Sequence, residues 1–321
     1  MNVNRDIDNK KVDLFYNLVD KACMIYYNDL GTDYLEAFIK VSESLTEEFD
    51  DLKLSKKSVD KLNSIYNQIT ETDFLNEEVR LACELIFVKG LKHRNVLLDF
   101  MTPDVINYLY VHIIKSILDN IEEFQKQEIT ILDTVLGTSN LLQTIINNIE
   151  NYKDVKIHGI GIEKDELLVH LSEAFSNILD NEIIINFNDA LKKINCCANI
   201  IVGDFGETKD IYKIIEERLE NLADDGFFIY VVNNDFFAYA SKEFKDVVSK
   251  NATLIGLIVL PQTFTNQNHI GKSILIGRKG ELSDYQMSII KMEDELSQEN
   301  LEMTFVKILN MFKEIGGNKN A

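Results

Sequence analysis

From about residue 100 onward, short β-rich runs alternate with helical segments, and this alternation constrains the fold more than any other feature. Runs rich in Ile, Val and Phe predict seven strands. These are 128–133, 155–163, 182–187, 198–204, 226–232, 254–260 and 272–278. Helical periodicity fills most of the gaps between them, at 139–150, 165–180, 209–223 and 236–250. Such an order predicts an α/β fold with a doubly wound, mainly parallel sheet covered by helices on both faces.

The end of the chain departs from this alternation. The predicted strands 254–260 and 272–278 are joined by "PQTFTNQNHIG" rather than by a helix, so we expect an antiparallel pair at one edge of the sheet. An acidic segment at about 284–314 is predicted to be a closing helix.

The first 95 residues have a different texture, because apolar side chains recur there at helical spacing and strand-like runs are absent. One such face is formed by Leu14, Leu18, Ala22 and Tyr26. We therefore expect two domains, a helical N-terminal domain at 1–95 and an α/β domain at 96–321 that includes the C-terminal helix.

The amino-acid composition limits which classes of partner we expect this protein to bind. The formal net charge is -20, and the longest basic piece is as short as "KHR" at 92–94, whereas binding a phosphate backbone requires many Lys and Arg side chains. Free DNA is therefore disfavoured as a partner. No long uninterrupted apolar run is present and the N-terminal stretch "MNVNRDIDNKK" is polar, so we expect a cytoplasmic protein without a membrane partner.

Several common site motifs are absent from the sequence. The five histidines are scattered and none lies at ligand spacing from a Cys or another His, so no metal site is predicted. "GIGIEK" contains two glycines but lies within a predicted strand, which disfavours a nicotinamide fingerprint. Neither a phosphate-binding "GxxxxGK[ST]" nor a "GxSxG" nucleophile turn occurs.

Acidic residues follow the first three predicted strands. Asp133 ends the first strand and Gly137 follows it, just before a helix begins near Ser139. Glu163 ends the second strand, where a carboxylate can accept both hydroxyls of a ribose. Asp189 follows the third strand, although an Asn-Asp pair there is also ordinary turn chemistry. Because ligands bind at the carboxyl edge of parallel sheets, these residues predict one shared site.

The same residues carry a resemblance to a known family. "ILDTVLGTSNLL" resembles the first motif of class I S-adenosylmethionine-dependent methyltransferases, in the "hLDPxxGTGxLL" form of the adenine-N6 DNA methylase group. "GIGIEKDELLVH" resembles the second motif, and "FMTPDVINYLY" resembles the "TP" segment over the methionine part of the cofactor. The layout, helical N-terminal part included, is similar to stand-alone methylase-like proteins of the YtxK type.

This resemblance implies a seven-stranded methyltransferase (Rossmann-like) sheet, S-adenosylmethionine as cofactor, and a set of binding residues. It places Glu163 at the ribose, Lys164 beside the adenine and Asp189 at the adenine amino group. The implied cofactor residues are Thr102, Pro103, Asp133, Leu136, Gly137, Thr138, Ser139, Asn140, Glu163, Lys164, Asp189 and Asp204.

The sequence departs from the family pattern at three points. Thr134 stands where the first motif has Pro, and Ser139 stands where it has a second Gly. After the fourth strand, amino methylases carry "[DNS]PP[YF]", whereas this chain has "IIVGDFGE", in which Asp204 and Phe205 are the nearest stand-ins for catalytic residues.

Two functions follow from this pattern. One is a methyltransferase of the N6-adenine-methylase-like group with a degenerate motif and an unidentified acceptor. The other is a non-catalytic cofactor-binding or scaffold protein on the same fold, with a protein partner or a homodimer formed through the helical N-terminal domain.

Overall fold

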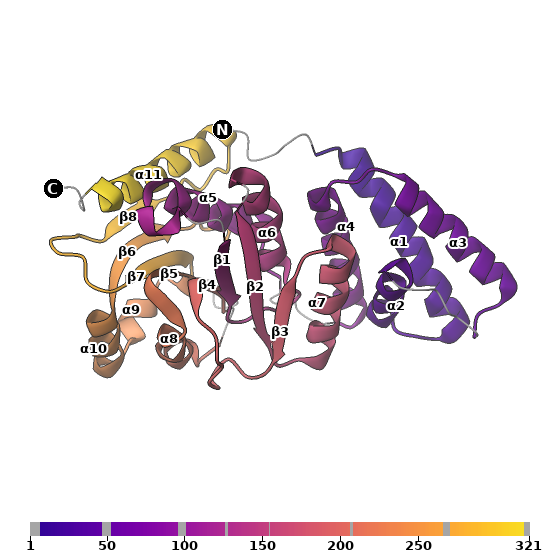
Figure 1. The fold of residues 1–321 in the computed structure, drawn as a ribbon, viewed down its shortest axis with the longest axis horizontal. Helices are drawn as coiled ribbons and strands as arrows, with labels where there is room; N and C mark the ends of the chain where they lie inside the picture. Colours follow the sequence, from indigo (N-terminus) through magenta and orange to yellow (C-terminus); the bar gives the residue numbers. More distant parts are fainter. Residues whose placement is uncertain are drawn as a thin grey trace.

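The computed structural model describes residues 7–46, 53–95, 101–125, 128–153, 155–205, 208–265 and 270–317. Within these residues the β-rich runs form one eight-stranded sheet, in the order β3-β2-β1-β4-β5-β7-β6-β8 (Figure 1). The strands are β1 (Glu128–Asp133), β2 (Lys156–Glu163), β3 (Ile183–Phe187), β4 (Ala198–Asp204), β5 (Leu222–Asn233), β6 (Ala252–Val259), β7 (Lys272–Lys279) and β8 (Ser288–Lys291).

The strand order creates a switch point between β1 and β4. Strands β1 to β5 pair in parallel, and β1 pairs with β2 on one side and with β4 on the other. The chain runs outward from β1 to β3 and then returns to β4 on the other side of β1. The helices that follow β1 and β4 therefore lie on opposite faces of the sheet. A crevice at the carboxyl ends of such a strand pair is where open parallel sheets bind ligands.

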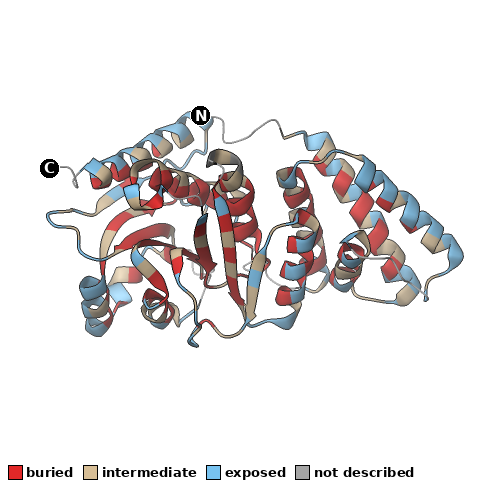
Figure 2. Ribbon diagram, viewed as in Figure 1, coloured by how far each residue is buried: buried red, intermediate tan, exposed pale blue. Residues whose placement is uncertain are grey.

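Helices cover both faces of the sheet, which explains why the strands are continuous apolar runs. On one face, α5 (Asp104–Asn120), α6 (Asn140–Lys153) and α11 (Gln298–Gly317) share a core with Ile131 and Ile229. On the other face, α8 (Ile211–Leu219) and α10 (Lys242–Asn251) pack against Leu132 and Phe228. Figure 2 shows the buried residues concentrated in the central strands and on the inner sides of these helices.

In the described part of the chain, four helices come before α5, namely α1 (Asn9–Leu30), α2 (Tyr34–Thr46), α3 (Lys56–Glu71) and α4 (Asn76–His93). Their apolar faces form a core that also includes α7 (Glu166–Leu179), the helix between β2 and β3. Phe87 of α4 contacts Phe175 of α7 edge to face, with ring centroids 5.1 Å apart. Ser42 of α2 donates to the carbonyl of Ala174 at 2.7 Å. The N-terminal helices therefore pack directly on the sheet's own helices, as Figure 1 shows.

The predicted closing helix at 284–314 is wrong at its beginning. Residues Ser288–Lys291 form β8, which pairs in parallel with β6, and α11 begins only at Gln298. Ile289 is 67% exposed and Ile290 is 6% exposed, so the segment has the two-residue period of a strand within an acidic stretch. The antiparallel pairing of β6 with β7 is confirmed, but the pair does not form the edge, because β8 lies outside β6.

Smaller differences lie near β5. The helix predicted at 236–250 is divided into α9 (Phe236–Tyr239) and α10, because Ser241 caps α10 by accepting from the Phe244 N–H at 3.1 Å. The remaining short helical element is the 3-10 turn η2 (Glu122–Phe124). Among the described residues, no helix is both long and apolar enough to cross a membrane.

A candidate cofactor site at the switch point

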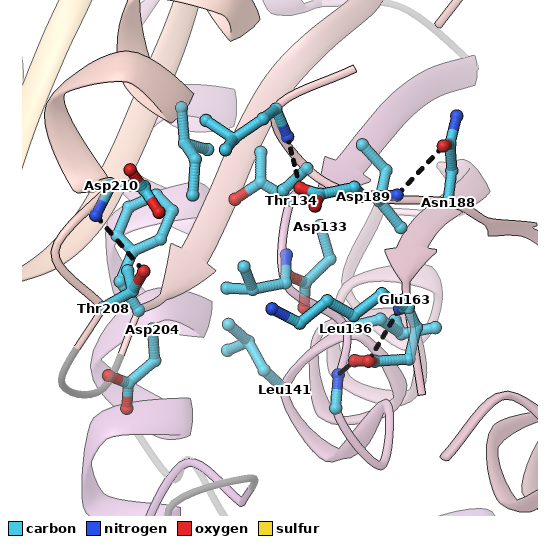
Figure 3. A pocket seen from close by; sticks show the side chains of 18 of the residues that line it. Asp133, Thr134, Leu136, Leu141, Glu163, Asn188, Asp189, Asp204, Thr208 and Asp210 are labelled. Carbon is cyan, nitrogen blue, oxygen red and sulfur yellow. Dashed lines mark hydrogen bonds between the residues drawn. The ribbon is translucent and has the colours of Figure 1, made fainter. Parts of the chain in front are cut away.

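A cavity of about 360 Å³ opens at the carboxyl ends of β1, β2 and β4. Ten of the predicted site residues line it, namely Thr102, Asp133, Leu136, Gly137, Asn140, Glu163, Lys164, Asp189, Asp204 and Phe205. Pro103, Thr138 and Ser139 do not line it, although each directly neighbours a residue that does. Figure 3 shows Asp133 near the middle of the site, Glu163 and Asp189 on one side, and Asp204 and Asp210 on the other.

Ten other lining residues are not among the predicted site residues. They are Thr134, Val135, Leu141, Ile162, Asn188, Ala190, Leu191, Thr208, Asp210 and Ile214. Most are immediate neighbours of motif residues, but Thr208 and Asp210 follow β4, where this chain lacks a recognisable motif. A search for acids along the whole loop after β4, and not only at Asp204 where that strand ends, would have found Asp210.

Asp133 is the buried acid at the centre of the site, with 2% of its surface exposed. Its Oδ1 accepts a hydrogen bond from the Val135 N–H at 3.1 Å. Burial raises the pKa of Asp133 to about 7, because the charged carboxylate loses its hydration; the Val135 bond opposes this rise, and the charges of Glu163 and Asp204 add to it. A cation placed beside Asp133 would lower that pKa again.

The loop after β1 is held on two sides. The Gly137 N–H donates to Glu163 Oε2 at 2.8 Å, and the Leu136 N–H donates to the Ile162 carbonyl at 2.9 Å. On the other side, the Ser172 hydroxyl of α7 donates to the Gly137 carbonyl at 3.0 Å. Gly137 has a φ of +57°, a conformation that glycine adopts without steric cost. These three hydrogen bonds and the backbone conformation of Gly137 therefore define the shape of the loop.

Thr134 has a structural role at the position where the family motif has Pro. Its N–H and its hydroxyl both donate to the Val202 carbonyl, each at 3.0 Å, and so join the end of β1 to β4. Gly203 makes room for this contact, since a Cβ there would lie 2.5 Å from Thr134 Oγ1. A proline could make neither bond, so the departure from the motif exchanges a rigid ring for two hydrogen bonds.

Ser139, which stands where the family motif has a second Gly, has a φ of +61°, in the left-handed region that favours glycine. Its side chain is fully buried, and its Oγ has no hydrogen-bond partner among the described residues. Thr138 Oγ1 is buried without a partner in the same way. The turn therefore has a left-handed backbone conformation at Ser139 and carries two buried hydroxyl groups that make no hydrogen bond with the described residues.

Glu163 and Asp189 hold the turns that face the cavity. Glu163 Oε1 accepts from the backbone N–H groups of Lys164 and Asp165 at 2.8 and 2.9 Å, while its other oxygen binds Gly137. Asp189 Oδ1 accepts from the Leu191 N–H at 2.9 Å. A carboxylate offers about four acceptor positions, so each still has capacity for a ligand.

The residues after β4 are engaged with the protein itself. Lys272 Nζ lies 3.7 Å from Asp204 Oδ1, and the Phe205 ring is 6% exposed. That ring packs against Tyr230, with centroids 5.0 Å apart. Phe205 therefore lies at the cavity wall as part of the core, and the catalytic roles of Asp204 and Phe205 remain predictions.

The charge of the cavity is strongly negative. Five carboxyl side chains line it, against one lysine, Lys164, among the described lining residues. The carboxyl groups belong to Asp133, Glu163, Asp189, Asp204 and Asp210. Such a lining favours a ligand that carries positive charge. No group of three or more His, Cys, Asp or Glu residues in the described ranges is arranged to hold a metal ion.

This fold, with its switch point and glycine loop, is that of the class I S-adenosylmethionine-dependent methyltransferases. The chain aligns with a Listeria monocytogenes protein assigned to that class, with a TM-score of 0.79 and 24% identity, over 95% of this chain and 100% of that one. It also aligns with a type I restriction-modification methyltransferase subunit from Streptococcus thermophilus, with a TM-score of 0.61 and 18% identity, over 94% and 74% of the two chains.

Sequence comparison identifies a more specific relative. Residues 13–91 match the family model of the YtxK N-terminal helical domain. YtxK of Bacillus subtilis strain 168, itself described as uncharacterized, is 26% identical over 267 residues, which are 74% of this chain and 79% of the relative. The predicted resemblance to class I methyltransferases of the YtxK type, and the predicted α/β fold with its helical N-terminal part, are confirmed. The sheet has eight strands rather than seven.

Proposed function

We propose that this protein binds S-adenosylmethionine in the cavity at the switch point and is a methyltransferase of the N6-adenine-methylase-like group whose acceptor is not yet identified. The observation that carries the proposal is the clamped loop, in which the Gly137 N–H donates to Glu163 Oε2 beside the buried Asp133. The cavity lining also fits S-adenosylmethionine, because its five carboxyl side chains suit a ligand that carries a positively charged sulfonium and ammonium.

Each residue has a proposed part in binding. Glu163 would accept the ribose hydroxyls, Asp189 would accept from the adenine amino group, and Lys164 would lie beside the adenine. Thr102, Pro103 and Asn140 would face the methionine part, with Asp133 nearby in the turn that also includes Leu136, Thr138 and Ser139. The cofactor supplies an activated methyl group, and the chain's own task is to hold donor and acceptor in line, which needs little further apparatus.

A second function is favoured by the residues after β4. Phe205 packs on Tyr230 and Asp204 lies near Lys272, so both residues that would hold an acceptor already have protein contacts. This arrangement would suit a non-catalytic cofactor-binding or scaffold protein. Such a protein would bind a protein partner or a second copy of the chain through α1–α4.

Calorimetric titration with S-adenosylmethionine and S-adenosylhomocysteine tests binding. We expect both ligands to bind wild-type protein at micromolar concentration and Glu163→Ala to lose that binding. Glu182→Ala is the matched control, because this glutamate is 83% exposed and lies outside the cavity lining. Absence of binding at millimolar ligand would exclude cofactor binding and the methyltransferase, and would leave only a scaffold that binds no cofactor.

Methyl transfer separates the two functions. Radiolabelled cofactor and purified protein are incubated with cell extract, which is then divided into DNA, RNA, protein and small-molecule fractions. Labelling of one fraction that is lost in Asp204→Asn supports the enzyme. Binding without labelling of any fraction supports the scaffold.

A further inference from the structure

Arg80 of α4 is a fully buried cation that joins three helices. Within α4, its Nε lies 2.8 Å from Glu77 Oε1 and its Nη1 lies 3.2 Å from Glu84 Oε2. The same Nη1 lies 3.0 Å from Asp104 Oδ1, at the beginning of α5, and donates to Asn140 Oδ1 at 2.7 Å, at the beginning of α6. A residue of the N-terminal helices thus holds the first turns of two helices that border the cavity.

Two of the four partners of Arg80, Asp104 and Asn140, lead to the cavity wall. Asn140 lines the cavity, and its Nδ2 donates to the Thr102 carbonyl at 3.4 Å. Asn107 Nδ2 donates to the same carbonyl at 3.1 Å and to Asp104 Oδ1 at 3.2 Å. Because a guanidinium can only donate, Arg80 fixes which way the Asn140 amide points, with its oxygen toward Arg80 and its nitrogen toward Thr102.

Charge compensation makes this arrangement difficult to replace. Burial opposes the charge of Arg80, but the neighbouring carboxylates of Glu77 and Asp104 outweigh it and raise its pKa. Tyr108 of α5 also donates to Glu77 Oε1, at 2.7 Å, so α4 and α5 are joined through both members of the pair. Removal of the cation would leave the partly buried carboxylates of Glu77, Glu84 and Asp104 uncompensated beside the Thr102 segment.

We infer that Arg80 is a positioning residue through which the N-terminal helices set the Thr102–Asn140 wall of the cavity, so that cofactor affinity depends on a residue that touches no cofactor. This inference rests on the proposed function for its ligand. None of the cavity-lining residues belongs to α1–α4, so these helices act on the site through Asp104 and Asn140.

The test compares two buried arginines. Arg80→Met removes the link to Asn140, whereas Arg278→Met removes an arginine of β7 that is 2% exposed, donates to Asp225 Oδ1 at 2.7 Å and lies outside the cavity lining. Both variants should lower the melting temperature. Calorimetry with S-adenosylhomocysteine should show affinity about tenfold to a hundredfold weaker in Arg80→Met, the range typical when the outer partners that orient metal ligands are removed. Arg278→Met should bind as wild type does, and equal losses in both variants would overturn the inference.

A second readout needs no ligand and covers the case in which Arg80→Met does not fold. Arg80→Lys keeps the charge, but its single nitrogen cannot span Glu77 and Asn140 as the planar guanidinium does. Amide hydrogen exchange across residues 134–140 should be faster in Arg80→Lys than in Arg278→Lys, and equal exchange would overturn the inference. If wild-type protein binds no cofactor, the proposed function fails, while this comparison still decides the role of Arg80.

Discussion

The backbone N–H of Gly137 donates to the carboxylate of Glu163 at 2.8 Å, which joins the turn after β1 to the end of β2. This bond brings together the two strand ends that the sequence motifs assign to the cofactor. It also means that Glu163 supports the loop as well as facing the ligand, so its removal should affect both stability and binding.

Replacement of Glu163 separates those two effects. Glu163→Ala removes acceptors for the N–H groups of Gly137, Lys164 and Asp165, and should lower the free energy of unfolding by about 1–3 kcal/mol. Glu163→Gln keeps one carbonyl oxygen and should lose less. Urea unfolding gives the stabilities, and calorimetry gives the affinities. Equal stability of wild type and Glu163→Ala would show that the loop does not depend on this carboxylate.

Asp133 should make stability depend on pH. Its pKa is raised from 3.8 to about 7 in the folded protein, so between these values the folded state binds more protons than the unfolded state. Stability should therefore fall as the pH rises from about 4 to about 7, by up to about 4 kcal/mol, and then level off. Asp133→Asn should lack this contribution. Urea unfolding over this pH range tests it, and identical pH profiles for the two proteins would contradict the account.

Cofactor binding should release a proton near neutral pH. A sulfonium or ammonium beside Asp133 favours its charged form, so the carboxyl must ionise when the ligand binds. Calorimetry in buffers of different ionisation enthalpy measures the proton number directly. Asp133→Asn is the control, and proton release that is the same in both proteins would assign it to another group.

Ser139→Gly should stabilise the protein. The serine has a φ of +61° and a buried hydroxyl without a partner in the described structure, and a left-handed non-glycine residue costs about 1–2 kcal/mol. Glycine loses about 0.5–1 kcal/mol in chain entropy, which leaves a net gain of up to about 1.5 kcal/mol. Gly137→Ala, at a φ of +57°, should change stability in the opposite direction. A lower melting temperature for Ser139→Gly would contradict this interpretation of the loop.

Thr134→Pro restores the family motif but should destabilise this chain. The substitution removes the N–H and hydroxyl bonds to the Val202 carbonyl, at a cost of about 1–3 kcal/mol. Thr134→Val keeps the N–H bond and should cost less. Thermal unfolding of the three proteins tests the order, and a proline variant as stable as wild type would show that the two bonds contribute little.

The sequence predicted the sheet because strands buried on both faces appear as continuous apolar runs, as in β1 and β5. It predicted the glycine loop because Gly137 and the acids after each strand recur at fixed places in the fold. It could not reveal β8, where the two-residue period lies within an acidic segment, nor the burial of Phe205, which depends on its contact with Tyr230.

Arg80 illustrates a further limit of sequence patterns. Glu77, Arg80 and Glu84 have the three- and four-residue spacing of an exposed ion pair on a helix surface, which usually contributes little. In the structure Arg80 is fully buried, because α4 packs against α6. The role of Arg80 therefore depends on residues such as Asn140, which are distant in the sequence and are not part of the local pattern.

Calorimetric titration of S-adenosylmethionine into wild-type protein and Glu163→Ala tests the central claim most directly. The account predicts one site per chain with micromolar affinity in the wild-type protein, and loss of that affinity in the variant, with Glu182→Ala unchanged. Absence of binding to wild-type protein at millimolar ligand, or equal affinity in Glu163→Ala, would contradict it.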